Sequence, residues 1–200
     1  MKAVSLFFCL LLSLTSAQAK VNVDQLWTGQ YKNHLGEQVS LEQFKSKVII
    51  LEWLNHECPF IKKHYHSKYK NMQKLQEQAK QNGLVWLSVI SSAPGKQGHV
   101  SSDQALKDYE KHGSQAAMVI LDENGELGRA FGAKTTPHMF IISKSGQLLY
   151  QGAIDDNSSA DENDIVDSKN YVAAALEQLK KGNEDFVVKK TSPYGCSVKY

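Results

Sequence analysis

Short apolar runs alternate with amphipathic stretches along most of this chain. The runs at 47–53, 84–90 and 117–121 are rich in aliphatic residues and bounded by polar or glycine-containing segments, which predicts three buried strands. After the first run, apolar residues recur at three- and four-residue spacing at Ile61, Tyr65, Tyr69, Met72, Leu75 and Ala79. This period predicts one long amphipathic helix that ends near Asn82-Gly83.

The remaining pattern predicts shorter elements. In chain order they are a strand at 38–41, a short capped helix from Ser40 to Phe44, a helix from Ser101 to His112, a helical piece up to Phe131, a hairpin of 139–142 with 147–152, a polar acidic loop at 155–167, and a helix at 171–181. The tail at 183–200 has no strong periodicity. Strands alternating with helices, followed by a hairpin, indicate the α/β class with a mixed sheet flanked by helices.

The N-terminal residues have the pattern of a secretory signal peptide. Lys2 precedes an apolar run at 3–14, and Ala17-Gln18-Ala19 is a small-x-small cleavage site. We therefore expect residues 1–19 to be removed and the protein to be periplasmic or secreted. No later segment is apolar enough to span a membrane.

Composition narrows the possible partners. Without Lys2 the chain has 22 basic and 21 acidic side chains, so its net charge is near zero and nucleic acid is not an expected partner. Arg129 is the only arginine, which disfavours a site dominated by phosphate recognition. About 180 residues remain after cleavage, enough for one domain at 20–182 with a proper core, followed by the tail.

The candidate chemistry lies where the first buried strand meets the helix. Cys58 follows the strand and Pro59 begins the helix, so the thiol stands at a helix N-terminus. Helix N-termini favour negative charge and lower the pKa of a thiol. Cys58 and Cys196 are the two cysteines that remain after cleavage, and this placement points to thiol redox chemistry.

The order of elements over 35–181 resembles the thioredoxin fold. The closest motifs are at 52–65, 91–99, 135–142 and 194–200, and they are similar to exported bacterial proteins of the redoxin, or AhpC/TSA-like, family. The resemblance implies a cis-proline at Pro137, which would hold the Thr136 backbone beside the thiol. It also implies substrate contacts at Pro59, Thr136, Pro137 and His138, the last as a possible base.

The same resemblance implies no cofactor. It implies protein thiols, protein disulfides or small peroxides as partners, and a separate thiol protein as electron donor. Two departures from the thioredoxin and peroxiredoxin patterns narrow the range of expected reactions. Thioredoxins place a second cysteine where this chain has Ile61. Peroxiredoxins place a threonine at Asn55 and an arginine near Pro137, so the usual peroxide pocket is missing, although Asn55 could still donate a hydrogen bond near the thiolate.

Glu52 matches the buried acid that thioredoxins use in proton transfer. A carboxyl at the end of a buried strand has a raised pKa, which suits acid–base chemistry. The alternative is a side chain that points to solvent. Lys62 and Lys63, in the first turn of the helix, would favour a thiolate, but a solvated helix face accounts for them more simply.

Cys196 completes the candidate catalytic set of Cys58, Cys196, Glu52 and Asn55. It could resolve an oxidised Cys58 by forming a Cys58–Cys196 disulfide. The alternatives are a permanent structural disulfide and a bond between subunits. No metal site is expected, because the residues near Cys58, among them His56, His64 and His66, form an incomplete ligand set.

Three functions are consistent with the sequence. The first is a thiol–disulfide oxidoreductase with Cys58 as nucleophile and Cys196 as possible resolving cysteine. The second is a peroxide reductase with the same cysteines. The third is a non-catalytic binding module with a structural disulfide.

Overall fold

The computed structural model describes residues 21–66 and 68–200 of the 200-residue chain. The expected signal peptide at 1–19 lies outside the described residues. Within them, every helix is too short or too polar to cross a bilayer.

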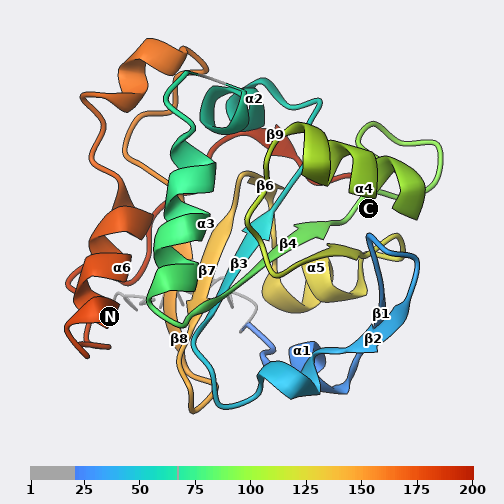
Figure 1. Ribbon diagram of the computed structural model, residues 1–200, viewed down its shortest axis with the longest axis horizontal. Helices are drawn as coiled ribbons and strands as arrows, with labels where there is room; N and C mark the ends of the chain where they lie inside the picture. Colours follow the sequence, from blue (N-terminus) through green and yellow to red (C-terminus); the bar gives the residue numbers. More distant parts are fainter. Residues whose placement is uncertain (1–20, 67) are drawn as a thin grey trace, which may run out of the picture.

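A seven-stranded mixed sheet forms the centre of the described part of the chain (Figure 1). Its strands, in spatial order, are β2 (Gln38–Ser40), β1 (Gln30–Asn33), β5 (Met118–Leu121), β4 (Val85–Ile90), β3 (Ile49–Trp53), β7 (Met139–Ile142) and β8 (Leu148–Gly152). Strands β3, β4 and β5 are parallel, and the other pairs are antiparallel.

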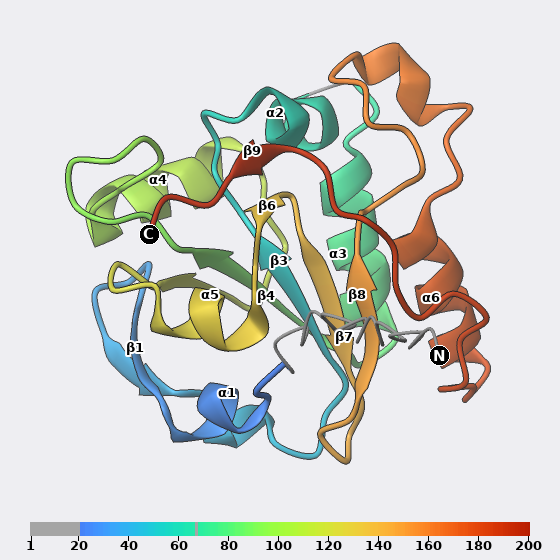
Figure 2. The same cartoon turned by 180° about the vertical axis from the view of Figure 1, so that it is seen from behind.

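Helices cover both faces of this sheet (Figures 1 and 2). One face packs against α2 (Pro59–Tyr65), α3 (Asn71–Gln81), α4 (Ser102–Lys111) and α6 (Tyr171–Lys180). The other packs against α1 (Asp24–Thr28), the 3₁₀ helix Leu41–Phe44 and α5 (Glu126–Phe131). A second 3₁₀ helix is Glu162–Ile165. The α/β class and the mixed sheet flanked by helices are confirmed.

Strand β3 lies between β4 and β7 and is buried on both faces. Alternate residues therefore face different cores: Ile50 belongs to the core under α2 and α3, and Ile49 to the core under α1 and α5. Glu52 has the same parity as Ile50, so its carboxyl points into an apolar layer, and its side chain is fully buried. The alternative of a solvent-facing Glu52 is wrong.

The long helix expected after Cys58 is two helices. α2 ends at Tyr65, and α3 begins after Lys70, whose backbone is left-handed at φ 48°. The Gln73 side chain donates to the Tyr65 carbonyl at 2.8 Å, so a side-chain amide satisfies a carbonyl that a continuous helix would have satisfied. The apolar period predicted burial correctly, because Tyr65 and Met72 both reach the core, but it carried no signal for the break.

The tail is less irregular than its sequence indicates. Residues of β9 (Cys196–Ser197) pair antiparallel with β6 (Thr135–Thr136). Figure 2 shows the tail crossing the molecule beside β6 and α2. Further along, the Lys199 carbonyl accepts from the Ala93 amide at 2.8 Å. The tail is therefore an added layer over the end of the sheet where Cys58 lies.

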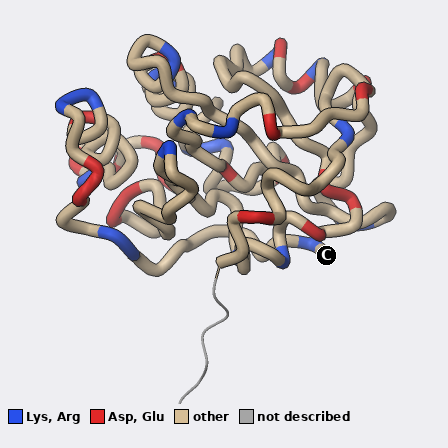
Figure 3. The backbone as a smooth tube through the Cα atoms, turned by 90° about the horizontal axis from the view of Figure 1, so that it is seen from below, with Lys and Arg blue, Asp and Glu red and all other residues tan. Residues whose placement is uncertain are grey.

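Charged positions of both signs are interspersed along the backbone (Figure 3). This agrees with a net charge near zero.

Candidate functional site

Cys58 stands between the end of β3 and the start of α2. It is the N-cap residue of α2, and Pro59 occupies the first helical turn, where its missing N–H costs nothing. The Cys58 side chain is fully buried. In the thiol form its Sγ donates to the Thr136 carbonyl at 3.1 Å.

Cys196 is brought to the same place by strand pairing. Thr136 of β6 is the register partner of Cys196, so the residue that contacts Cys58 also carries Cys196 beside it. Gly195 permits this approach, because a Cβ there would lie 2.1 Å from the Thr136 oxygen and its φ is +127°. Both cysteines of the described chain are free thiols, and Cys196 is partly exposed.

The two thiols are electrostatically unequal. Burial raises the pKa of Cys58, but hydrogen bonds from the Cys196 thiol and from the Ile61 backbone amide outweigh it, so the net pKa lies below the ordinary value. Burial and the hydrogen bond to Cys58 raise the pKa of Cys196 to about 11. Of the two thiols, Cys58 therefore loses its proton more readily, and Cys196 keeps its own to higher pH.

The Thr136–Pro137 peptide bond is cis, as the resemblance to the thioredoxin fold implies, and the Thr136 backbone lies beside the Cys58 thiol. His138 does not approach Cys58. Its Nδ1 accepts from the Lys134 amide at 3.2 Å, and its ring lies 4.3 Å from that of Phe140, in the core on the opposite face of the sheet. Burial and then Lys134 lower the pKa of His138 to about 3, so it is also a poor base at neutral pH.

Glu52 is held by four donors on one oxygen. Its Oε2 accepts from Trp86 Nε1 at 2.8 Å, from Tyr65 Oη and Ser88 Oγ at 3.0 Å, and from Gln76 Nε2 at 3.3 Å. Burial raises its pKa to about 7 despite these bonds. Oε1 has no hydrogen-bond partner among the described residues. The group can therefore gain or lose a proton near neutral pH.

Asn55 shapes the loop before Cys58. Its Oδ1 accepts from the Glu57 amide at 2.9 Å, and its carbonyl accepts from the Cys58 amide at 3.0 Å. Among the described residues, none of its hydrogen bonds goes to the Cys58 sulfur. Gly98 packs on it so closely that a Cβ there would lie 2.6 Å away.

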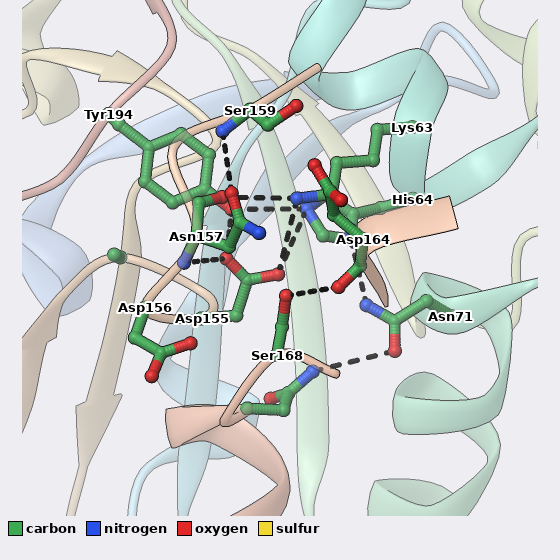
Figure 4. A network of polar contacts seen from close by, with 12 residues as sticks. Lys63, His64, Asn71, Asp155, Asp156, Asn157, Ser159, Asp164, Ser168 and Tyr194 are labelled. Carbon is green, nitrogen blue, oxygen red and sulfur yellow. Dashed lines mark hydrogen bonds and ion pairs between the residues drawn. The ribbon is translucent and has the colours of Figure 1, made fainter. Parts of the chain in front are cut away.

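A buried polar network ties α2 to the tail (Figure 4). Lys63 is buried; its Nζ donates to the Asn157 carbonyl at 3.0 Å and lies 3.7 Å from Asp155 Oδ2. Tyr194, two residues before Cys196, donates its hydroxyl to Asp155 and lies 3.4 Å from His64 Nε2. The solvated-face interpretation is thus wrong for Lys63, although Lys62 is exposed.

Sequence reasoning did not identify this network. Asp155 belongs to a segment that reads as a polar loop, yet it is buried. Burial and its bond to Asp155 raise the pKa of Tyr194. The one signal available was Lys63 at a position where a cation opposes the helix dipole.

One cluster among the described residues has the donor set of a metal site. It consists of His56, His66 and His112 and contains neither cysteine. The thiol site itself holds no set of metal ligands in the described part of the chain.

Comparison with known proteins identifies the family and the fold of this chain. The Redoxin family model matches residues 21–169, which is more than half of the chain. A search of curated proteins gave no significant match. Among solved structures, the chain is similar to an uncharacterized conserved protein from Geobacillus kaustophilus, with a TM-score of 0.69 and 24% identity over 86% of this chain and 87% of that one.

Two further structures show the same likeness. A hypothetical protein from Sinorhizobium meliloti gives a TM-score of 0.67 at 18% identity, over 86% of this chain and 90% of that one. Peroxiredoxin Q from Xanthomonas campestris gives 0.53 at 13% identity, over 80% and 91%. At such identities the likeness establishes the fold alone, and the expected thioredoxin-like fold is confirmed.

Proposed function

The chain belongs to the Redoxin family of thioredoxin-fold proteins, and from that premise we propose that it is an exported thiol–disulfide oxidoreductase. Cys58 is the nucleophile and Cys196 the resolving cysteine. One observation carries the proposal: Thr136 contacts the Cys58 sulfur and is at the same time the strand partner of Cys196. A disulfide needs its two Cα atoms within about 7 Å, and the hydrogen bond between the Cys58 and Cys196 thiols supports such an approach.

The reaction follows from the opposite shifts of the two thiol pKa values, lowered for Cys58 and raised for Cys196. The Cys58 thiolate attacks a substrate disulfide, forms a mixed disulfide and releases one substrate thiolate. Cys196 loses its proton and attacks the Cys58 sulfur, which releases the second substrate thiolate and leaves a Cys58–Cys196 disulfide. Two electrons pass to the substrate, whose two thiolates take up one proton from Cys196 and one from solvent. A separate thiol protein returns the pair to the reduced state.

Glu52 serves the proton transfers of this cycle. Its pKa of about 7 lies near the operating pH, where a general acid or base is most effective. Its hydrogen bonds run to Tyr65 of α2, the helix that Cys58 caps. Glu52 therefore exchanges protons from the buried side of the Cys58 site, and its hydrogen-bond partners hold the carboxyl in place.

Substrate access requires the tail to move. Cys58 is fully buried, and β9 occupies the edge of β6 beside it. When β9 leaves, the Thr136 backbone becomes free to pair with an extended substrate strand. Pro59, which is exposed, and Pro137 then border the bound peptide. Asn55 keeps the loop before Cys58 in shape.

Trapping experiments test the proposal. Cys196→Ser is expected to accumulate a mixed disulfide on Cys58, identified by mass spectrometry after incubation with a model disulfide peptide. Cys58→Ser is the matched control and should trap nothing. Trapping on Cys196 instead would reverse the two roles.

A redox titration separates catalysis from a structural disulfide. A potential in the range of exchange enzymes, about −270 to −120 mV, supports the cycle, and one below about −300 mV identifies a permanent disulfide. Peroxide consumption, measured in parallel, is expected to be slow, because the threonine and arginine of the usual pocket are missing. Rapid consumption that depends on Cys58 would favour a peroxide reductase.

A further inference from the structure

Three histidines from separate parts of the chain converge beside the thiol site. His56 lies between β3 and α2, His66 is the C-cap of α2, and His112 is the C-cap of α4. One ring nitrogen from each lies within 4.8 Å of the others. The rings of His66 and His112 stack at 4.0 Å, and those of His56 and His112 at 4.4 Å.

This spacing is close to that of a metal site. With zinc–nitrogen bonds of 2.0–2.1 Å, tetrahedral ligand nitrogens stand about 3.4 Å apart. The three nitrogens therefore need to approach by roughly an ångström or slightly more. His66 is exposed and His112 is partly exposed, so their side chains are free to turn.

One buried nitrogen of the cluster also lacks a hydrogen-bond partner among the described residues. His56 Nδ1 is buried and has no hydrogen-bond partner among the described residues, which is costly for an imidazole nitrogen. Burial, and then the neighbouring imidazoles and Lys111, lower the pKa of His56 to about 3. The pKa of His66 falls to about 4, from burial first and then His112.

Nearby charges are mixed. Lys62 and Lys111 lie close enough to disfavour a further cation, and Asp108 opposes them. A net repulsion of exposed cations is weak next to coordination by three imidazoles, because solvent screens it.

The histidines open onto a groove. A cavity of about 810 Å³ between α3 and the end of α4 is bordered by His66 and His112, together with Gln73 and Lys74. Three protein ligands leave a fourth coordination position, and the groove supplies the space for water or a small anion to occupy it.

We propose that His56, His66 and His112 bind a zinc-class divalent transition-metal ion, with the fourth position open to the groove. Imidazole is a preferred ligand of this class. The site could not be predicted from the sequence, because His112 is remote from His56 along the chain. Only the packing of α4 against the sheet brings His112 beside His56. The inference does not rest on the proposed thiol chemistry, since neither cysteine belongs to the ligand set.

The test must remove the thiols, which bind zinc themselves. In full-length Cys58→Ser/Cys196→Ser protein, Zn²⁺ binding is measured by calorimetry, and Co²⁺ is added as a spectroscopic probe of tetrahedral coordination. His66→Ala and His112→Ala are the test variants, at positions where solvent exposure limits damage to the fold. His99→Ala is the matched control, because His99 lies outside the cluster and pairs with Glu123 at 3.4 Å.

We expect one Zn²⁺ per chain, visible-range Co²⁺ absorption, and at least a tenfold loss of affinity in each test variant, with His99→Ala unchanged. Histidine ring NMR signals should shift on Zn²⁺ addition for His56, His66 and His112. Absence of binding, or binding that both test variants retain in full, would overturn the site and leave the three rings as an aromatic stack.

Discussion

Replacing Glu52 by glutamine should remove a loss of stability that grows with pH, because it removes a titrating group from the interior. Glu52 is fully buried, with a pKa of about 7 in place of the ordinary 4.5. Glutamine has nearly the same shape, and its side-chain oxygen can accept from the four donors that now contact Oε2. It cannot ionise, so it carries no pH-dependent cost of burial.

The magnitude follows from the two pKa values. Below pH 4.5 the folded and unfolded states both hold the proton, and the carboxyl does not affect stability. Between pH 4.5 and pH 7 the unfolded chain loses its proton while the folded protein keeps it, so stability falls by about 1.4 kcal/mol per pH unit. Above pH 7 both states are ionised and the penalty is constant. Between pH 5 and pH 8 the penalty grows by about 2.5 kcal/mol.

The assay is urea unfolding at pH 5 and pH 8, followed by tryptophan fluorescence, for the wild-type protein and Glu52→Gln under reducing conditions. The free energy of unfolding of the variant relative to wild type should rise by about 2–3 kcal/mol between these pH values. Histidine titrations are common to both proteins and cancel. A relative stability that stays within about 0.5 kcal/mol would show that Glu52 has an ordinary pKa, and would refute its proton-transfer role as well.

Three further changes test the tail and the buried network. Gly195→Ala puts a Cβ against the Thr136 oxygen at a positive φ, so we expect a loss of about 1–3 kcal/mol and faster alkylation of the two cysteines; unchanged alkylation would contradict the close approach. Asp155→Ala leaves the buried Lys63 amine without its acid and should cost about 3–5 kcal/mol in urea unfolding, a loss that a Lys63→Met second change should partly restore; additive losses would argue against the pair. Ser101→Ala removes the N-cap hydrogen bond of α4, a helix that carries neither cysteine, and should cost about 1 kcal/mol without altering alkylation rates, which makes it the control for unspecific destabilisation.

Local chemistry was sufficient for the central strands and for the placement of Cys58 at the start of a helix. Aliphatic runs predict the buried strands, and Cys58 before Pro59 predicts the start of a helix. Both signals depend on neighbouring residues alone. The cis-proline at Pro137 is confirmed, although it came from resemblance and not from any local pattern. The break between α2 and α3 was missed, because Gln73 satisfies the Tyr65 carbonyl by a contact that the apolar period does not encode.

The sequence by itself therefore determined an α/β chain with the Cys58 thiol at a helix N-terminus and a second thiol, Cys196, far along the chain. Only the tertiary structure decided that β9 pairs with β6 and brings Cys196 to Cys58, that Lys63 and Asp155 are buried together, and that His112 meets His56. These contacts join residues remote in sequence, and their energies depend on burial and on exact distance. Neither quantity exists until the helices have packed on the sheet.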